Sequence, residues 1–282
     1  MLTNREYASV ILLSLCVLGC LFLDGVRKSI IPTLKILLSP KLFTPFLVYF
    51  IYVTSIISIA SFLQVWYGAL FKDTLIVIFG VGLPMLIQAA TSKSGSIIVH
   101  KTFERVLGIS TLLVFYLNLS SFSIFGELIL QVTATMASIF LIIAMTDSAK
   151  YSELEKFLKA LLAMIGIGML TFTTFHLTKT WQSVDSREIL LSFAMTLWLP
   201  FTILPFAYVL GFYSAAELAL TMIKHSNTGK KPKPRVLIAV LLGFRGKIGY
   251  AANFTGDWRY QIASVEKYRE AQKIMERYRS AI

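Results

Sequence analysis

The chain is predicted to be an all-α, polytopic membrane protein with a small basic region at its C-terminal end. Hydrophobic residues make up 56% of its 282 residues, and the mean hydropathy is +0.71. Seven apolar stretches are long enough to cross a hydrocarbon core, which takes roughly 20 residues of helix. We therefore divide the chain into a transmembrane helical bundle, residues 1–224, and a basic, mainly helical cytosolic region, residues 225–282.

The spans are assigned as helices because backbone groups that face lipid must be hydrogen-bonded within their own segment. Unbroken runs such as Ser9–Cys20 lack the alternating pattern of a membrane β-barrel. We expect the first span to be retained rather than cleaved, since its apolar run continues past Cys20. In chain order, the predicted spans are Tyr7–Leu23, Phe43–Trp66, Thr74–Ala90, Arg105–Ser121, Glu127–Thr146, Phe157–Thr178 and Ile189–Ile223.

The segments between and within the spans give further expectations. Val26–Lys41 has an apolar and a basic side, which fits a helix lying in the inner membrane interface or a helical extension of a neighbouring span. Ser120–Phe125 is a short uncharged hairpin between the fourth and fifth spans. Pro200 and Pro205 interrupt the seventh span and are expected to kink it. Such kinks occur in moving gating helices and in static packed helices alike.

The C-terminal region contains two apolar patterns. Val236–Leu242 is too short to span a membrane and is expected to dock on the bundle or the interface, as a helix or a strand. Trp258–Ser280 is predicted to be helical. Its apolar residues, at spacings of three and four, fit a short coiled-coil seam or packing on the same chain. These residues are Tyr268, Ala271, Met275, Tyr278 and Ile282.

Basic residues orient the spans, because Lys and Arg concentrate in cytoplasmic loops. With the N-terminus outside, the outer segments hold four basic residues, namely Arg5, Lys72, Lys179 and Arg187. The inner loops then hold ten, namely Arg27, Lys28, Lys35, Lys41, Lys93, Lys101, Arg105, Lys150, Lys156 and Lys159. We expect a multi-pass protein of the bacterial inner membrane, with its N-terminus outside and its C-terminus in the cytoplasm.

The C-terminal region is the most basic part of the chain. Residues 224–282 hold thirteen of the 27 basic residues and only four acidic ones. Such an excess favours nucleic acid, a nucleotide or anionic lipid as a partner, although an ordinary positive-inside signal with a solvated face explains it too. The candidate anion-binding residues are Lys230, Lys231, Lys233, Arg235, Arg245 and Lys247.

Polar residues form a row along one face of each of two spans. Such rows line a narrow aqueous path or bond neighbouring helices, and one sequence leaves both uses open. The fifth-span row is Glu127, Gln131, Thr135 and Ser138, and the sixth-span row is Thr171, Thr174 and Thr178. All seven are candidate pore-lining residues.

Several classes of protein are disfavoured by what the sequence lacks. The predicted spans carry no ionisable residue at mid-depth, which argues against a proton-coupled carrier. The chain has no glycine-rich phosphate loop, no His/Cys cluster with metal spacing and no nucleophile-elbow motif. We therefore predict no catalytic residue, no metal and no cofactor, and we expect a protein that is not an enzyme.

Four short motifs carry a family resemblance: Asn4-Arg5-Glu6, Leu38-Ser39-Pro40-Lys41, Lys72-Asp73-Thr74 and Glu127-Leu128. With them, the chain resembles a group of uncharacterised bacterial polytopic inner-membrane proteins, and this resemblance implies no activity or residue role. In layout, the chain is similar to the membrane effectors of bacterial anti-phage systems, in which a cytosolic anionic signal controls permeability.

These observations favour a homo-oligomeric channel or membrane-permeabilising effector. An anionic cytosolic ligand at the basic region would control it, and the layout suggests phage defence as its role. A secondary transporter of a small solute, with the proline-containing seventh span as its moving part, is one alternative. A membrane scaffold without transport, whose basic region docks a cytosolic partner, is the other.

Overall fold

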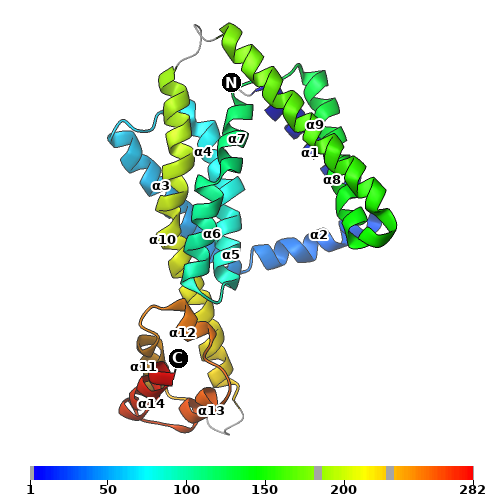
Figure 1. Ribbon diagram of the computed structural model, residues 1–282. Helices are drawn as coiled ribbons and strands as arrows, with labels where there is room; N and C mark the ends of the chain where they lie inside the picture. Colours follow the sequence, from blue (N-terminus) through cyan, green and yellow to red (C-terminus); the bar gives the residue numbers. More distant parts are fainter. Residues whose placement is uncertain (1–2, 181–185, 227–231, 282) are drawn as a thin grey trace. The chain divides into compact units, whose positions relative to one another are not determined.

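The computed structural model describes residues 3–180, 186–226 and 232–281, which form helices and the loops between them (Figure 1). The chain forms two compact units. Unit 1 comprises Met1–Thr44 and Ile109–Ile189, and unit 2 comprises Pro45–Gly108 and Leu190–Ile282. The basic C-terminal region therefore belongs to unit 2, together with the helices of residues 45–108 and the last long helix.

Six helical segments of the described residues are long and apolar enough to cross a membrane, which indicates a multi-pass membrane protein. They are Asn4–Leu21, Pro40–Phe62, Gly68–Thr91, Ile124–Thr146, Lys150–Thr180 and Arg187–Lys224. Each corresponds to one predicted span, so six of the seven predicted spans have a matching helical segment.

The predicted fourth span, Arg105–Ser121, is wrong as a continuous helix. The chain forms α6 (Gly95–Leu107) and α7 (Ile109–Asn118), and Gly108 between them has an extended backbone with φ −66° and ψ 148°. Glycine is a poor helix former, which makes this position a natural break. At about 1.5 Å per residue, α7 alone is about 15 Å long and too short to cross a membrane.

Unit 1 is built around α8 (Ile124–Thr146), which packs against both α1 (Asn4–Leu21) and α9 (Ser148–Thr180). Helix α7 also contacts α9. Helix α1 begins with a capping box, in which the Thr3 hydroxyl accepts from the Glu6 amide and the Glu6 carboxylate accepts from the Thr3 amide.

Helix α2 (Asp24–Leu37) is a separate helix of unit 1 that runs across the direction of α1 in Figure 1. The chain leaves helical structure at Phe22 and Leu23 before α2, and again at Leu38 and Ser39 after it. The segment is therefore not a continuous extension of either neighbouring span. Its position in the membrane interface stays a prediction.

The membrane part of unit 2 combines α3 (Pro40–Phe62), the predicted third span, α6 and α10 (Ser186–Lys224). The third span consists of the 3-10 turn η1 (Gly68–Leu70), α4 (Phe71–Val77), the π-helical turn η2 (Ile78–Gly82) and α5 (Leu83–Thr91). Large apolar side chains from these helices form a common core. It includes Tyr49, Val53, Met85, Leu86, Ile98, Leu199 and Ile203.

Helix α10 remains helical through Pro200 and Pro205, so the prolines do not divide it, and the kink expected there stays a prediction. The helix continues past the membrane core into a second core, to which its last turns contribute Ala216, Ala219 and Ile223. The predicted domain boundary at residue 224 thus falls at the end of a helix that serves both cores.

The second core is completed by four short helices: α11 (Pro234–Gly243), α12 (Ile248–Ala252), α13 (Asp257–Ser264) and α14 (Tyr268–Ala281). Val236–Leu242 is therefore helix and not strand. The predicted helix Trp258–Ser280 is divided, because the chain is non-helical from Val265 to Lys267.

The apolar seam of α14 packs within its own chain. Ala271, Met275 and Tyr278 are buried in the second core, and α14 lies against α11. Tyr268 is 37% exposed, and Ile282 lies outside the described residues. Packing on the same chain, and not a coiled coil, explains the seam.

Candidate functional site

The exposed side of α6 carries four ionisable residues, His100, Lys101, Glu104 and Arg105, which we call the ionisable face of α6. The opposite side of the helix is buried through Ile98, Thr102 and Val106. His100 Nε2 lies 3.1 Å from Glu104 Oε1, and these two side chains are 75% and 63% exposed. The face therefore points away from the packed helices of unit 2.

Contacts with α10 show which part of that helix lies beside the ionisable face. Gly95, at the start of α6, lies against the Tyr208 ring, and the rings of Phe103 and Phe201 are 4.9 Å apart. The two helices therefore run antiparallel, with Phe103 level with Phe201. No charged residue occurs between Glu188 and Glu217 of α10.

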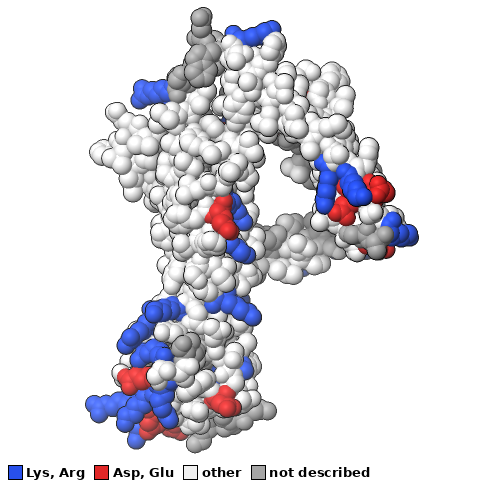
Figure 2. Space-filling model, viewed as in Figure 1, with Lys and Arg blue, Asp and Glu red and all other residues white. Residues whose placement is uncertain are grey.

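Phe201 lies near the middle of this uncharged segment. It follows Glu188 by 13 residues and precedes Glu217 by 16. At about 1.5 Å per residue, these separations are about 20 Å and about 24 Å. Glu104 is adjacent to Phe103, so the ionisable face lies beside the middle of the longest apolar helix of unit 2. Figure 2 shows acidic and basic side chains over α6 that are surrounded by uncharged surface.

A charged side chain that faces lipid at the bilayer centre costs about 2.5–3.5 kcal/mol or more. The ionisable face is thus unsuited to lipid, and it fits a protein surface or water. The sequence predicted no ionisable residue at mid-depth because it placed the start of the fourth span at Arg105. In the structure, the residues of this face belong to a helix that already begins at Gly95. The three- and four-residue spacing of Ile98, Thr102 and Val106 is the signal that could have revealed this amphipathic helix.

Among the predicted pore-lining residues, Glu127 is fully buried in unit 1. Its carboxylate lies 3.2 Å from Arg5 Nη2 and accepts a 2.9 Å hydrogen bond from the Phe122 amide. Arg5 also donates to the carbonyl oxygens of Leu117, at 2.8 Å, and Ser120, at 3.2 Å. This network joins the first turn of α1 to the start of α8.

Gln131 belongs to the same network, since its amide nitrogen donates to the Arg5 carbonyl at 2.9 Å and its oxygen accepts from the Ser9 hydroxyl at 3.1 Å. Glu127 and Gln131 therefore bond α8 to α1, which is the helix-packing use of the fifth-span row. Further along α8, Thr135 and Ser138 are exposed, and the Ser138 hydroxyl donates to Ala134 of its own helix.

The sixth-span row lies on the exposed side of α9. The hydroxyls of Thr171, Thr174 and Thr178 each donate to a carbonyl of α9 at 2.9 Å. Thr174 also shares a 2.8 Å hydrogen bond with the Tyr116 hydroxyl of α7. Although α8 and α9 pack together, no hydrogen bond between described residues joins the two predicted rows.

The predicted anion-binding residues separate into different places. Lys230 and Lys231 lie outside the described residues. Lys233 pairs with the Glu266 carboxylate at 2.5 Å, and Arg235 donates to the Glu266 carbonyl at 3.1 Å, so both have partners within the chain. Arg245 and Lys247 lie instead in the loop before α12, where Arg245 has a positive φ of 50° and is exposed.

No cluster suited to a metal ion is found in the described part of the chain. Residues 3–180, 186–226 and 232–281 contain no group of three or more His, Cys, Asp or Glu side chains arranged to hold a metal ion. Cys16 and Cys20 are both free thiols.

Comparison with protein-family models, with curated proteins and with solved structures gives no match. The resemblance of the four sequence motifs therefore stays an expectation. Function is inferred from the geometry of α6 and its surroundings.

Proposed function

We propose that the protein is an ion-conducting membrane channel that assembles as a homo-oligomer, with the ionisable face of α6 lining its aqueous path. The observation that carries this proposal is the position of His100, Lys101 and Glu104 beside the middle of the uncharged segment of α10. Several copies arranged around an axis would place this face on water and the apolar sides of unit 2 on lipid.

The surface proposed to line the path differs from the one that the sequence predicted. Glu127 and Gln131 hold α1 and α8 together, so their polar groups support packing in unit 1. The exposed hydroxyls of Thr135, Ser138, Thr171, Thr174 and Thr178 stay secondary candidates for pore lining. Charged groups in a water-filled path set ion selectivity, so the α6 residues are the stronger candidates.

Seven crossings, with the N-terminus outside and the C-terminus in the cytoplasm, belong to the same proposal. The fourth crossing would comprise residues 95–118, since these 24 residues exceed the roughly 20 that a helix needs to cross the hydrocarbon core. A bacterial inner membrane and a permeabilising role in phage defence remain predictions from the layout.

Planar-bilayer recording of the purified protein tests conduction directly. We expect single-channel steps for the wild type, and a change of several-fold in conductance or a shift of reversal potential for Glu104→Gln, Lys101→Gln and His100→Ala. Glu153→Gln is the matched control, because Glu153 is also exposed and contacts a basic residue of its own helix, Lys156. Wild-type protein without steps, or α6 variants that all conduct like the wild type, would contradict the proposal.

A proton-coupled carrier is the second candidate. It is favoured by the 3.1 Å contact between His100 and Glu104, because proton relays in membranes use such carboxylate and imidazole groups. Proteoliposomes distinguish the two functions. A carrier accumulates solute under a proton gradient without unitary current steps, whereas a channel only dissipates gradients.

A further inference from the structure

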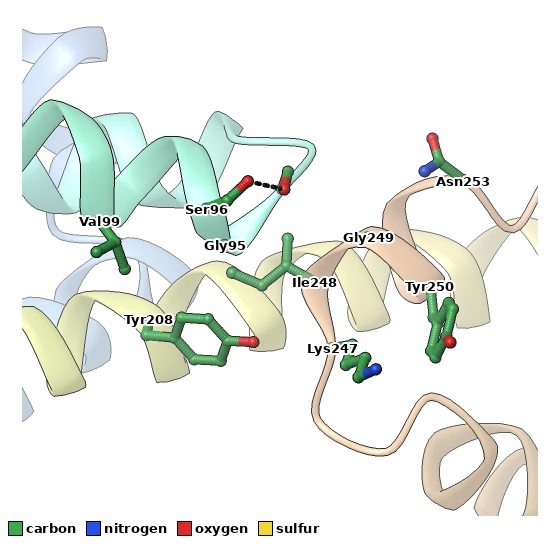
Figure 3. A pocket seen from close by; sticks show the side chains of 10 residues that line it. Gly95, Ser96, Val99, Tyr208, Lys247, Ile248, Gly249, Tyr250 and Asn253 are labelled. Carbon is green, nitrogen blue, oxygen red and sulfur yellow. Dashed lines mark hydrogen bonds between the residues drawn. The ribbon is translucent and has the colours of Figure 1, made fainter. Parts of the chain in front are cut away.

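The first turn of α6 forms one wall of a pocket in unit 2, where the membrane core meets the basic region. The pocket has a volume of about 460 Å³. Its other walls come from α10 and from the loop and helix at residues 247–253 (Figure 3). The residues that supply polar or aromatic groups are Ser94, Ser96, Tyr208, Lys247, Tyr250 and Asn253. A space of this size holds a small-molecule ligand or a lipid headgroup.

The polar groups of the pocket are suited to an anion. The hydroxyls of Ser94 and Ser96 are hydrogen-bonded to each other at 2.8 Å, so one donates within the pair and the other keeps its hydrogen for a ligand. The Ser94 side chain does not cap α6, which leaves amide donors of the first turn without that partner. Lys247 supplies a positive charge, with its Nζ 5.1 Å from the centre of the Tyr250 ring, and Asn253 adds an amide.

The pocket lies at the end of the membrane core that adjoins the basic region, near the edge of the hydrocarbon core. Tyr208 is seven residues beyond Phe201 along α10, about 10 Å toward the basic region. Ser94, just before α6, and Lys247, just before α12, line the pocket together with Tyr208. Tyrosine and lysine are typical of the membrane–water interface. The Lys93 carbonyl lies 3.9 Å from the position of a Cβ on Gly249, so the loop before α6 and the start of α12 approach each other closely.

We propose that this pocket binds the phosphate group of an anionic ligand. Phosphate oxygens accept hydrogen bonds from hydroxyl, amide and ammonium donors together, and Lys247 balances part of their charge. The phosphate belongs to an anionic phospholipid of the inner leaflet or to a soluble phosphate compound. Binding itself does not require conduction. An effect of bound phosphate on the ionisable face rests on the proposed function. Such an effect would pass along α6, because the same helix forms both sites.

Binding is measured on the full-length protein in nanodiscs, by two readouts that do not depend on conduction. Native mass spectrometry detects phosphatidylglycerol retained from discs that contain it together with phosphatidylcholine. Equilibrium dialysis against radiolabelled inorganic phosphate, with discs of phosphatidylcholine alone, detects a soluble ligand. Retention of phosphatidylglycerol alone assigns the pocket to lipid, and retention of phosphate in the second experiment assigns it to a soluble compound.

Lys247→Gln is expected to weaken whichever binding is found by about tenfold, as loss of a charge-assisted hydrogen bond does. Ser96→Ala is expected to weaken it less. Lys273→Gln is the matched control, because it removes one positive charge from the exposed side of α14, outside the pocket. Circular dichroism confirms that each variant is folded. The proposal is overturned if the wild type retains neither ligand, or if Lys247→Gln binds as well as Lys273→Gln.

Discussion

At the scale of single residues, two acidic side chains of the chain have opposite environments. Glu127 is fully buried, paired with Arg5 and bonded to a backbone amide. Glu104 is 63% exposed and pairs with a histidine on the same helix. A buried carboxylate is tolerated only when its partners are close and its hydrogen bonds are complete. Glu127 is therefore a structural residue, and Glu104 is available for interaction with ions or another surface.

Arg5→Gln is expected to lower the stability of unit 1, because it leaves the buried Glu127 carboxylate without its charge partner. Breaking a buried pair in this way costs about 3–5 kcal/mol. The double variant Arg5→Gln/Glu127→Gln should recover part of the loss, since no charge is then buried alone. Thermal unfolding in detergent measures both effects. Lys156→Gln, which removes an exposed pair, should change stability by less than about 1 kcal/mol. An Arg5→Gln midpoint equal to that of Lys156→Gln would contradict this role.

Ionisation of Tyr278 is expected to make the stability of the second core depend on pH in the alkaline range. Burial, and secondarily the charge of Tyr250, raises the pKa of Tyr278 from 10.0 to about 12. Its hydroxyl donates to the Tyr250 carbonyl at 2.7 Å, which requires the protonated form. The folded protein therefore holds this proton more tightly than the unfolded chain. Below pH 10, ionisation of Tyr278 should not change the stability of the folded protein. As the pH rises from 10 to about 12, the stability should fall.

Absorbance of tyrosinate at 295 nm measures this titration. The difference between the wild type and Tyr278→Phe should show a single group with a midpoint near pH 12. A midpoint near 10, the ordinary value, would mean that the hydroxyl reaches water in the folded protein.

At the scale of elements, the predicted third span, which belongs to unit 2, contains a π-helical turn that is in close contact with one tyrosine. Tyr49 of α3 donates to the Ile78 carbonyl at 3.2 Å, and its hydroxyl occupies the space where a Cβ on Gly82 would lie. A π-turn widens the helix locally and leaves carbonyl groups for side-chain partners. Tyr49 thus joins α3 to the point at which η2 passes into α5.

Gly82→Ala is expected to destabilise unit 2 by about 1–3 kcal/mol, as overpacking of a close contact does. Gly80→Ala is the matched control, because it lies in the same turn and a Cβ there meets nothing within 4 Å. Tyr49→Phe should relieve much of the Gly82→Ala defect, since it removes the hydroxyl that the new methyl group meets. Thermal unfolding of the three variants tests this, and equal midpoints for Gly80→Ala and Gly82→Ala would show that the contact is unimportant.

At the scale of the whole molecule, the chain divides its apolar residues between two kinds of environment. Unit 2 has one core among its membrane helices and a second among α11–α14, with α10 contributing to both. Many other large apolar side chains are exposed, among them Leu13, Ile129, Ile142 and Phe157. Such a surface is suited to lipid and not to water. On the face of the molecule shown in Figure 2, basic side chains gather over the C-terminal region.

The number of crossings is the prediction that belongs to this scale. Reporter fusions after Lys93 and after Ser121 should report opposite sides of the membrane, because α6 and α7 together would complete the crossing that neither makes alone. The fusion after Lys93 should share the side of a C-terminal fusion, in the cytoplasm. Reporters on the same side at residues 93 and 121 would give an even number of crossings and would place the N-terminus with the basic region.

The helical membrane class, the six apolar segments and the basic end were predictable from the sequence, because hydropathy and charge are properties of consecutive residues. The helical periodicity of α14 was predictable for the same reason. The division at Gly108 was not, since a glycine within an apolar run is compatible with a continuous membrane helix until its neighbours are known.

Only the tertiary structure decided what the polar residues do. Glu127 begins a polar row in the sequence, but its partner, Arg5, is 122 residues away, and hydrogen bonds to Arg5 and Phe122 account for its burial. The charges of α6 are next to an apolar run in the sequence, and their depth follows from contacts with α10, about 100 residues later. Depth and pairing are relations between distant segments, and no local pattern of residues encodes them.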